Sequence, residues 1–193
     1  MSANGLTSSQ TVGPFFFPCL LREDACRSVL VLPETVGERI RIEGRVFDGD
    51  GIPVPDAMVE IWQANAHGRY NHPLDQGPAA LDPSFMGFGR CGTDDDGYYW
   101  FETIKPGAVP FGDGRLQAPH ICVSVFARGL LNHVVTRLYF ADEPANADDP
   151  VLHYVPVDRQ ATLLAQRESG SESIVYRFDI VLQGEGETVF FNL

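Results

Sequence analysis

Hydrophobic and polar residues alternate along several short segments of this chain, as they do in β-strands with one buried face. In residues 39–47, Ile40, Ile42 and Val46 alternate with charged residues, so one side of this segment is expected to face a core. Residues 174–182 show the same period of two, with a hydrophobic residue at every second position. The pattern predicts a half-buried strand in each of these two segments.

Four further segments are rich in β-branched and aromatic residues and are therefore also predicted to be strands. They are residues 57–63, 119–127, 134–141 and the second half of 93–104, whose first residues form a turn. Only residues 158–167 have helical character. Many short strands separated by Gly/Pro turns, without a strand–helix–strand rhythm, favour an all-β fold, which we predict to be an antiparallel β-sandwich or a barrel.

The first 35 residues differ from the rest because they hold few periodic patterns and several chain breakers. Within them Phe15, Phe16 and Phe17 are adjacent, and exposing three phenylalanines to water favours association. We therefore expect residues 1–35 to form an extended N-terminal arm that packs on its own domain or on a partner chain. Residues 36–193 are expected to form the sandwich, since 193 residues with 44% hydrophobic composition suffice for one substantial core.

The charge balance limits the possible partners and the compartment. Fourteen basic and 26 acidic residues give a formal net charge of −12, which disfavours nucleic acid and anionic membrane surfaces as partners. The first residues lack the basic and apolar regions of a secretion signal, and no apolar run is long enough to span a bilayer. We expect a cytoplasmic protein whose four cysteines are buried free thiols.

Candidate metal-ligating residues lie in one strand and in one long loop. His120 and Cys122 stand two apart in a predicted strand, so both side chains project from the same face. Tyr70 lies in the loop 65–87, and loops of this length are usually functional or interfacial. Phenolate and imidazole groups are suitable ligands for Fe(III). From the residues alone we favour the alternative, in which His120 is hydrogen-bonded in a sheet, Cys122 packs in the core and Tyr70 anchors the loop.

Five longer stretches resemble one enzyme family, the intradiol ring-cleavage dioxygenases. They are SSQTVGPFF (8–16), GRVFDGDGIPVPDAMVEIWQANAHGRY (44–70), GFGRCGTDDDGYYWFETIKPG (87–107), APHICVSVFARGLLNHVVTRLYF (118–140) and YRFDIVLQGEGETVFFNL (176–193). Their occurrence together and in order makes the resemblance specific and extends it over nearly the whole chain. The family fold is a β-sandwich, in agreement with the strand pattern.

The resemblance implies which positions would hold iron. Metal-bearing chains of the family bind Fe(III) through two tyrosines and two histidines, with an arginine three positions before the first histidine. The four family ligand positions correspond here to Tyr70, Val109, His120 and Cys122, and the arginine position corresponds to Gln117. Valine has no donor atom, and cysteine is a softer ligand that ferric iron tends to oxidise. We therefore expect this chain to bind no metal and to have no catalytic residues of its own.

The resemblance further implies a heteromer with a homologous β chain that holds the Fe(III). The complex would cleave 3,4-dihydroxybenzoate with O2 to 3-carboxy-cis,cis-muconate. This chain would stabilise the assembly and contribute to the substrate pocket at the interface with the β chain. Thr11, Gly13 and Pro14 of the arm would line that pocket. Arg128 would place a positive charge near the substrate carboxylate.

Two other functions remain open at this stage. One is a self-sufficient dioxygenase whose iron site is rebuilt from other residues, for which Tyr98, Tyr99, His67 and His72 are the candidates. The aromatic strand setting of the two tyrosines favours a core role for them instead. The second is a β-sandwich binding protein without enzymatic activity.

Overall fold

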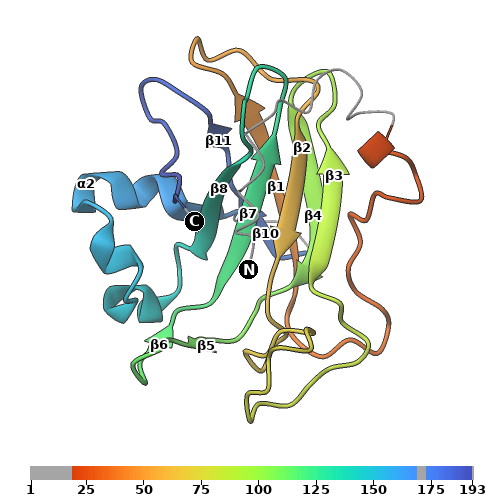
Figure 1. Ribbon diagram of the computed structural model, residues 1–193, viewed down its shortest axis with the longest axis vertical. Coiled ribbons are helices and arrows are strands. Elements are labelled where there is room, and N and C mark those ends of the chain that lie inside the picture. Colours follow the sequence, from red (N-terminus) through yellow and green to blue (C-terminus); the bar gives the residue numbers. More distant parts are fainter. Residues whose placement is uncertain (1–18, 169–172, 193) are drawn as a thin grey trace, which may run out of the picture.

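The computed structural model describes residues 19–168 and 173–192 and shows a sheet-based fold with little helix (Figure 1). Nine described strands form one sheet, of which eight follow the order β11-β1-β10-β9-β8-β7-β2-β3 and the ninth, β4, pairs with β1 off this path. A separate ribbon consists of β5 and β6. The bounds are β1 (Arg39–Phe47), β2 (Met58–Trp62), β3 (Phe88–Gly92), β4 (Tyr98–Ile104), β5 (Val109–Pro110), β6 (Leu116–Gln117), β7 (His120–Phe126), β8 (Val134–Phe140), β9 (Leu164–Arg167), β10 (Val175–Arg177) and β11 (Ile180–Val181).

The core lies between the layer containing β1 and β4 and the layer containing β2, β7 and β8. Every second residue of β1 is buried, as the alternation predicts. Ile42 of β1 and Phe101 of β4 meet Ile61, Val123 and Leu138 of the other layer in one cluster. Each of these side chains is no more than 2% exposed, and full burial of one such side chain contributes about 1.5–3 kcal/mol. The predicted all-β class is therefore confirmed.

The strand pairing is mixed, and not antiparallel throughout as predicted. β1 pairs antiparallel with β4 but parallel with β10 and β11, and β8 pairs parallel with β9. Each of these parallel pairs includes a strand from the last third of the chain, namely β9, β10 or β11. After β8 the chain passes through short helices before it returns beside β8 and then beside β1. A sequence pattern specifies which face of a strand is buried but not the direction of its neighbour.

The segment predicted to be helical is only partly so. The described helices are η1 (Pro144–Asp148), η2 (Leu152–Tyr154), α2 (Val157–Gln160) and η3 (Ala161–Leu163), and none of them is long and apolar enough to cross a membrane. Residues 164–167 form β9, so the helix prediction is wrong there. Ala165 is fully buried and pairs with Phe140 of β8. Tertiary pairing has therefore overridden a modest helix propensity.

Part of the predicted N-terminal arm packs on the chain's own sandwich. Arg27 and Arg90 exchange two backbone hydrogen bonds of 2.8 and 3.0 Å, and the backbone N–H of Leu30 donates to Glu102. Leu30 and Val31 are buried in the main core cluster. The segment 1–18, with Thr11, Gly13, Pro14 and the three phenylalanines, lies outside the described residues. Its expected contact with a partner chain therefore stays a prediction.

Candidate functional site

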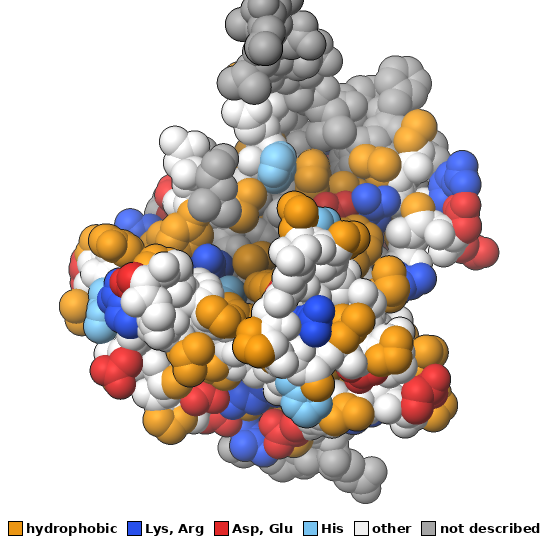
Figure 2. Space-filling model, turned by 60° about the horizontal axis from the view of Figure 1, so that its bottom comes forward, with side chains coloured by type: hydrophobic (Ala, Val, Ile, Leu, Met, Phe, Trp, Pro, Cys, Tyr) orange, Lys and Arg blue, Asp and Glu red, His pale blue; other side chains and the backbone are white. Residues whose placement is uncertain are grey.

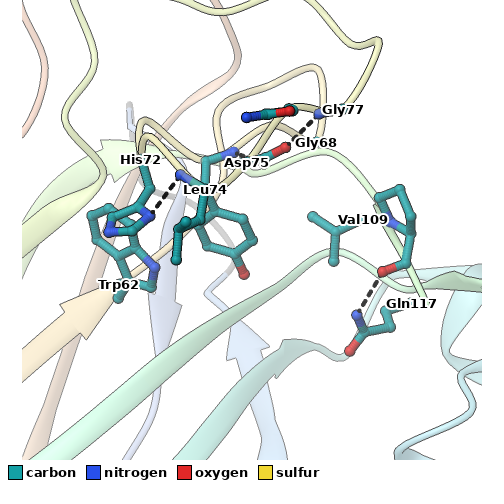
Figure 3. A pocket seen from close by; sticks show the side chains of 11 residues that line it. Trp62, Gly68, His72, Leu74, Asp75, Gly77, Val109 and Gln117 are labelled. Carbon is teal, nitrogen blue, oxygen red and sulfur yellow. Dashed lines mark hydrogen bonds between the residues drawn. The ribbon is translucent and has the colours of Figure 1, made fainter. Parts of the chain in front are cut away.

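A pocket of about 580 Å³ opens at the end of the sandwich that carries the loop 65–87 and the β5–β6 ribbon. The surface at this end is hollowed, and hydrophobic side chains gather around the hollow (Figure 2). Figure 3 shows Trp62, His72 and Leu74 on one side of the pocket and Val109 and Gln117 across from them. The volume suits a small organic molecule. The complete lining is Trp62, Gly68, Tyr70, His72, Leu74, Asp75, Gln76, Gly77, Val109, Pro110 and Gln117.

A glycine allows the two walls of this pocket to approach each other. Gly68 has a φ of +77°, and a Cβ atom at this position would lie only 1.9 Å from the carbonyl oxygen of Ala108. Any other residue would push the loop away from the segment before β5. The backbone N–H of Gly107 donates to the Asn65 carbonyl at 2.9 Å, which holds the same contact. Tyr70 and Val109, 39 positions apart in the sequence, thus line one pocket.

Tyr70 is held by its backbone and by an aromatic neighbour. Its N–H donates to the Asp75 carboxylate at 2.8 Å, and its ring stacks on Trp62 with 5.6 Å between the centroids. Burial is the main cause that raises the pKa of the Tyr70 phenol, and the nearby Cys122 thiol adds to it. The phenol is therefore neutral at pH 7.

His120 is buried at the start of β7, with 4% of the residue exposed. A carbonyl can only accept, so the 2.8 Å contact to Ala118 requires that Nδ1–H of His120 donates. Burial lowers the pKa of His120 to about 4, and the positive charge of Arg137 acts in the same direction. The imidazole is neutral at pH 7 and packs 5.6 Å from the Tyr139 ring. The hydrogen-bonded sheet histidine favoured from the residues alone is confirmed.

Cys122 faces the same side of β7 as His120 and is half-buried, not a core residue. In the sheet it stands opposite Trp62 of β2 and Arg137 of β8. Burial raises the pKa of the Cys122 thiol, so this position also offers a neutral group at pH 7. All four cysteines are free, but the expected burial holds fully only for Cys91, and Cys19 is exposed.

Arg137, which lies beside the family ligand positions, was not predicted from the sequence. Its Nη1 donates to Gln117 Oε1 at 2.7 Å and contacts the Tyr139 hydroxyl at 3.3 Å. Gln117 stands at the position where the resemblance places an arginine. A guanidinium is nevertheless present at this end of the sheet, because Arg137 of β8 supplies one. The alternation in β8 could have revealed it, because a charged residue stands there between the buried Thr136 and Leu138.

These residues do not fit a ferric ion. Val109 offers no donor atom, Cys122 is a soft ligand that ferric iron tends to oxidise, and a guanidinium stands opposite Cys122. In the described part of the chain, no group of three or more His, Cys, Asp or Glu side chains could hold a metal ion. The arrangement is a pocket that suits a small molecule, with the charged Arg137 beside the family ligand positions.

The start of β7 is fixed by a second buried residue that sequence reasoning missed. Asp149 is fully buried and accepts the backbone N–H of Ala118 at 2.7 Å. Its other oxygen accepts from the Tyr139 hydroxyl and from the backbone N–H groups of Val151 and Leu152. The carboxylate thus ties the segment before His120 to β8 and to the short helices.

The other predicted residues lie elsewhere. Arg128 follows the far end of β7, about 20 Å along the strand from His120, with 66% of its side chain exposed and an ion pair to Asp56. Tyr98 is hydrogen-bonded to Glu43, and the buried Tyr99 hydroxyl donates to the Phe178 carbonyl at 2.6 Å. The predicted core role is confirmed for Tyr99, whereas Tyr98 is only half-buried. Of the two histidine candidates, His72 lines the pocket and His67 is exposed.

Fold and pocket together define a ring-cleavage dioxygenase scaffold, and a dioxygenase family model matches residues 13–184. The chain belongs to the intradiol ring-cleavage dioxygenase family. It is 43% identical over 202 residues to the protocatechuate 3,4-dioxygenase alpha chain of Burkholderia cepacia, a match that covers 97% of both chains. The beta chain of the same organism is 42% identical over 175 residues, covering 87% of this chain and 74% of the relative.

A solved structure supports the same assignment. The dioxygenase domain of a dioxygenase and carbohydrate-binding fusion protein from Streptomyces sp. SirexAA-E superposes with a TM-score of 0.64 at 29% identity. The match covers 93% of this chain and 99% of that domain. The β-sandwich inferred from strand alternation and from the resemblance is thus the fold of solved members of the family.

Proposed function

We propose that this chain is the alpha subunit of a heteromeric protocatechuate 3,4-dioxygenase, in which a homologous beta chain holds the Fe(III). The observation that carries the proposal is the chemistry of two family ligand positions: Val109, which lines the pocket, has no donor atom, and Cys122 on β7 offers a neutral thiol. Nearly equal identity to an alpha and a beta chain from one organism supports two related subunits. The reaction is cleavage of 3,4-dihydroxybenzoate with O2 to 3-carboxy-cis,cis-muconate.

This chain contributes structure and charge to the complex, while the chemistry of the iron is supplied by the beta chain. Thr11, Gly13 and Pro14 of the N-terminal arm line the partner's substrate pocket. Arg128 supports the binding of the substrate carboxylate, and its exposed guanidinium suits a contact with another chain. A guanidinium at a partly desolvated interface favours an anionic substrate over a neutral catechol. The ion pair with Asp56 orients this guanidinium before assembly.

We further propose a cytoplasmic location for the complex. All four cysteines are free thiols, as in proteins of reducing compartments.

The test of this function is reconstitution with a beta chain. Co-expression should give a complex that contains both chains and cleaves 3,4-dihydroxybenzoate, whereas this chain alone should be inactive. Arg128→Gln in the complex should raise KM for 3,4-dihydroxybenzoate and leave KM for uncharged catechol nearly unchanged. Failure to co-purify, together with unchanged beta-chain activity in the absence of this chain, would favour a non-enzymatic binding protein instead.

A further inference from the structure

Arg137 and Cys122 stand directly opposite each other on neighbouring antiparallel strands. The register pairs Cys122 with Arg137 and His120 with Tyr139, so these four side chains share one face of the sheet. Side chains directly opposite in such a pair start about 5 Å apart. Arg137 therefore lies on the same face of the sheet as His120 and Cys122, two of the family ligand positions.

The contacts of Arg137 keep its guanidinium at this place. It donates to Gln117 Oε1 at 2.7 Å and lies 3.3 Å from the Tyr139 hydroxyl. Gln117 is itself fixed, because its amide donates to the Pro110 carbonyl at 3.2 Å. Burial alone would lower the pKa of Arg137, but its neighbours Tyr139, Cys122 and Tyr70 more than offset this and raise it. The side chain is therefore charged at every accessible pH.

Among the residues that the structure describes, Arg137 forms no direct ion pair with a carboxylate. The ion pairs found in residues 19–168 and 173–192 do not include Arg137, although the chain as a whole carries 12 excess negative charges. A largely buried cation without an acidic partner is costly. The neighbouring Tyr70, Cys122 and Tyr139 offer only dipoles and polarisable atoms. Asp149 is linked to the guanidinium through the Tyr139 hydroxyl and not by a direct ion pair, so a positive charge stays beside the family ligand positions.

We propose that Arg137 takes the place of the metal in this chain, as a fixed cation that holds Gln117 of the pocket lining and keeps metal ions out. A guanidinium offers five N–H donors to acceptors that a metal would otherwise engage. It also repels any multivalent cation that approaches Tyr70 and His120, because like charges in a poorly hydrated site interact strongly. The loss of metal binding thus has two causes, the missing donors and an opposing charge.

The experiment is to restore the ligands with and without removal of this charge. The double variant Val109→Tyr/Cys122→His supplies the two missing donors. The triple variant adds Arg137→Gln, which keeps a hydrogen-bonding side chain and removes the charge. A matched control adds Arg128→Gln to the same double variant, removing an arginine at the far end of β7. Each full-length chain is loaded with ferric citrate, desalted and assayed for bound iron and for the visible absorption of iron-bound tyrosinate.

The proposal predicts that only the Arg137→Gln triple variant holds iron close to one per chain and becomes coloured. Its affinity for ferric ion should exceed that of the double variant and of the Arg128→Gln control by at least about a hundredfold. Equal iron loading of the double and triple variants would overturn the proposal. Absence of iron from all variants that are folded by circular dichroism would overturn it as well, since charge removal would then have no effect.

Two provisions keep the test decisive if a variant folds poorly. Arg137→Met preserves the length of the side chain without its charge and should behave like Arg137→Gln. If a chain is insoluble alone, it is co-expressed with the beta chain, and iron beyond the wild-type content of the complex is counted. The proposed function is tested separately, because a wild-type chain without iron can still be the alpha subunit even if Arg137 proves irrelevant to metal exclusion.

Discussion

Replacing the buried carboxylate of Asp149 should destabilise the protein by an amount that the structure allows us to work out. In Asp149→Asn the amide oxygen can keep the three donors of Tyr139, Val151 and Leu152, but the amide N–H2 then faces the N–H of Ala118. The hydrogen bond from the Ala118 N–H to a charged acceptor is lost, and this N–H and the amide N–H2 are both left without an acceptor, which together cost about 3 kcal/mol. Asp149→Ala abandons all four donors and should cost about 5 kcal/mol.

Thermal unfolding followed by circular dichroism is the appropriate assay. For a chain of this size, about 3 kcal/mol corresponds to a fall in Tm of about 6–12 °C. Asp148→Asn is the matched control, because Asp148 is the adjacent residue, is exposed and should leave Tm nearly unchanged. A Tm of Asp149→Asn within about 2 °C of the wild-type value would refute the assignment of Asp149 as the anchor of β7.

Two further predictions concern pH and backbone packing. Burial lowers the pKa of His120 to about 4, so the unfolded state takes up a proton between about pH 6.5 and 4 that the folded state does not, and stability should fall by about 3 kcal/mol across this range. Urea unfolding of wild type and His120→Gln should show a smaller fall for the variant, and identical pH profiles would contradict the burial of a neutral imidazole. In Gly44→Ala the new Cβ would lie 1.9 Å from the Phe178 carbonyl oxygen, so Tm should fall by at least about 8 °C. Gly112→Ala, with open space around its Cβ, should change Tm by no more than about 2 °C, and equal effects of the two substitutions would show that the close approach is not real.

Much of the fold followed from local patterns in the sequence. The segment 39–47 was bounded correctly because its period of two is uninterrupted. The segment 174–182 has its buried side as predicted but forms two strands, with Phe178 and Asp179 between them. There the Phe178 carbonyl accepts from the Tyr99 hydroxyl, and the Asp179 side chain accepts from the Arg45 N–H. Such long-range hydrogen bonds leave no trace in the local periodicity.

The candidate site was predictable only in part. The resemblance correctly led us to expect Tyr70, Val109 and Gln117 in one region, which the structure shows as one pocket. Arg137 was missed because its importance depends on the register between β7 and β8, which sequence alone does not reveal. Asp149 was missed because a carboxylate that accepts four hydrogen bonds resembles any surface aspartate in the sequence.

Iron analysis of the purified wild-type chain tests the central claim most directly. The chain is expressed without a beta chain, incubated with ferric citrate, desalted, and assayed for bound iron and visible absorption. The account predicts a colourless protein with no bound iron above the desalting background. One tightly held ferric ion per chain, with a tyrosinate absorption band that disappears in Tyr70→Phe, would contradict it.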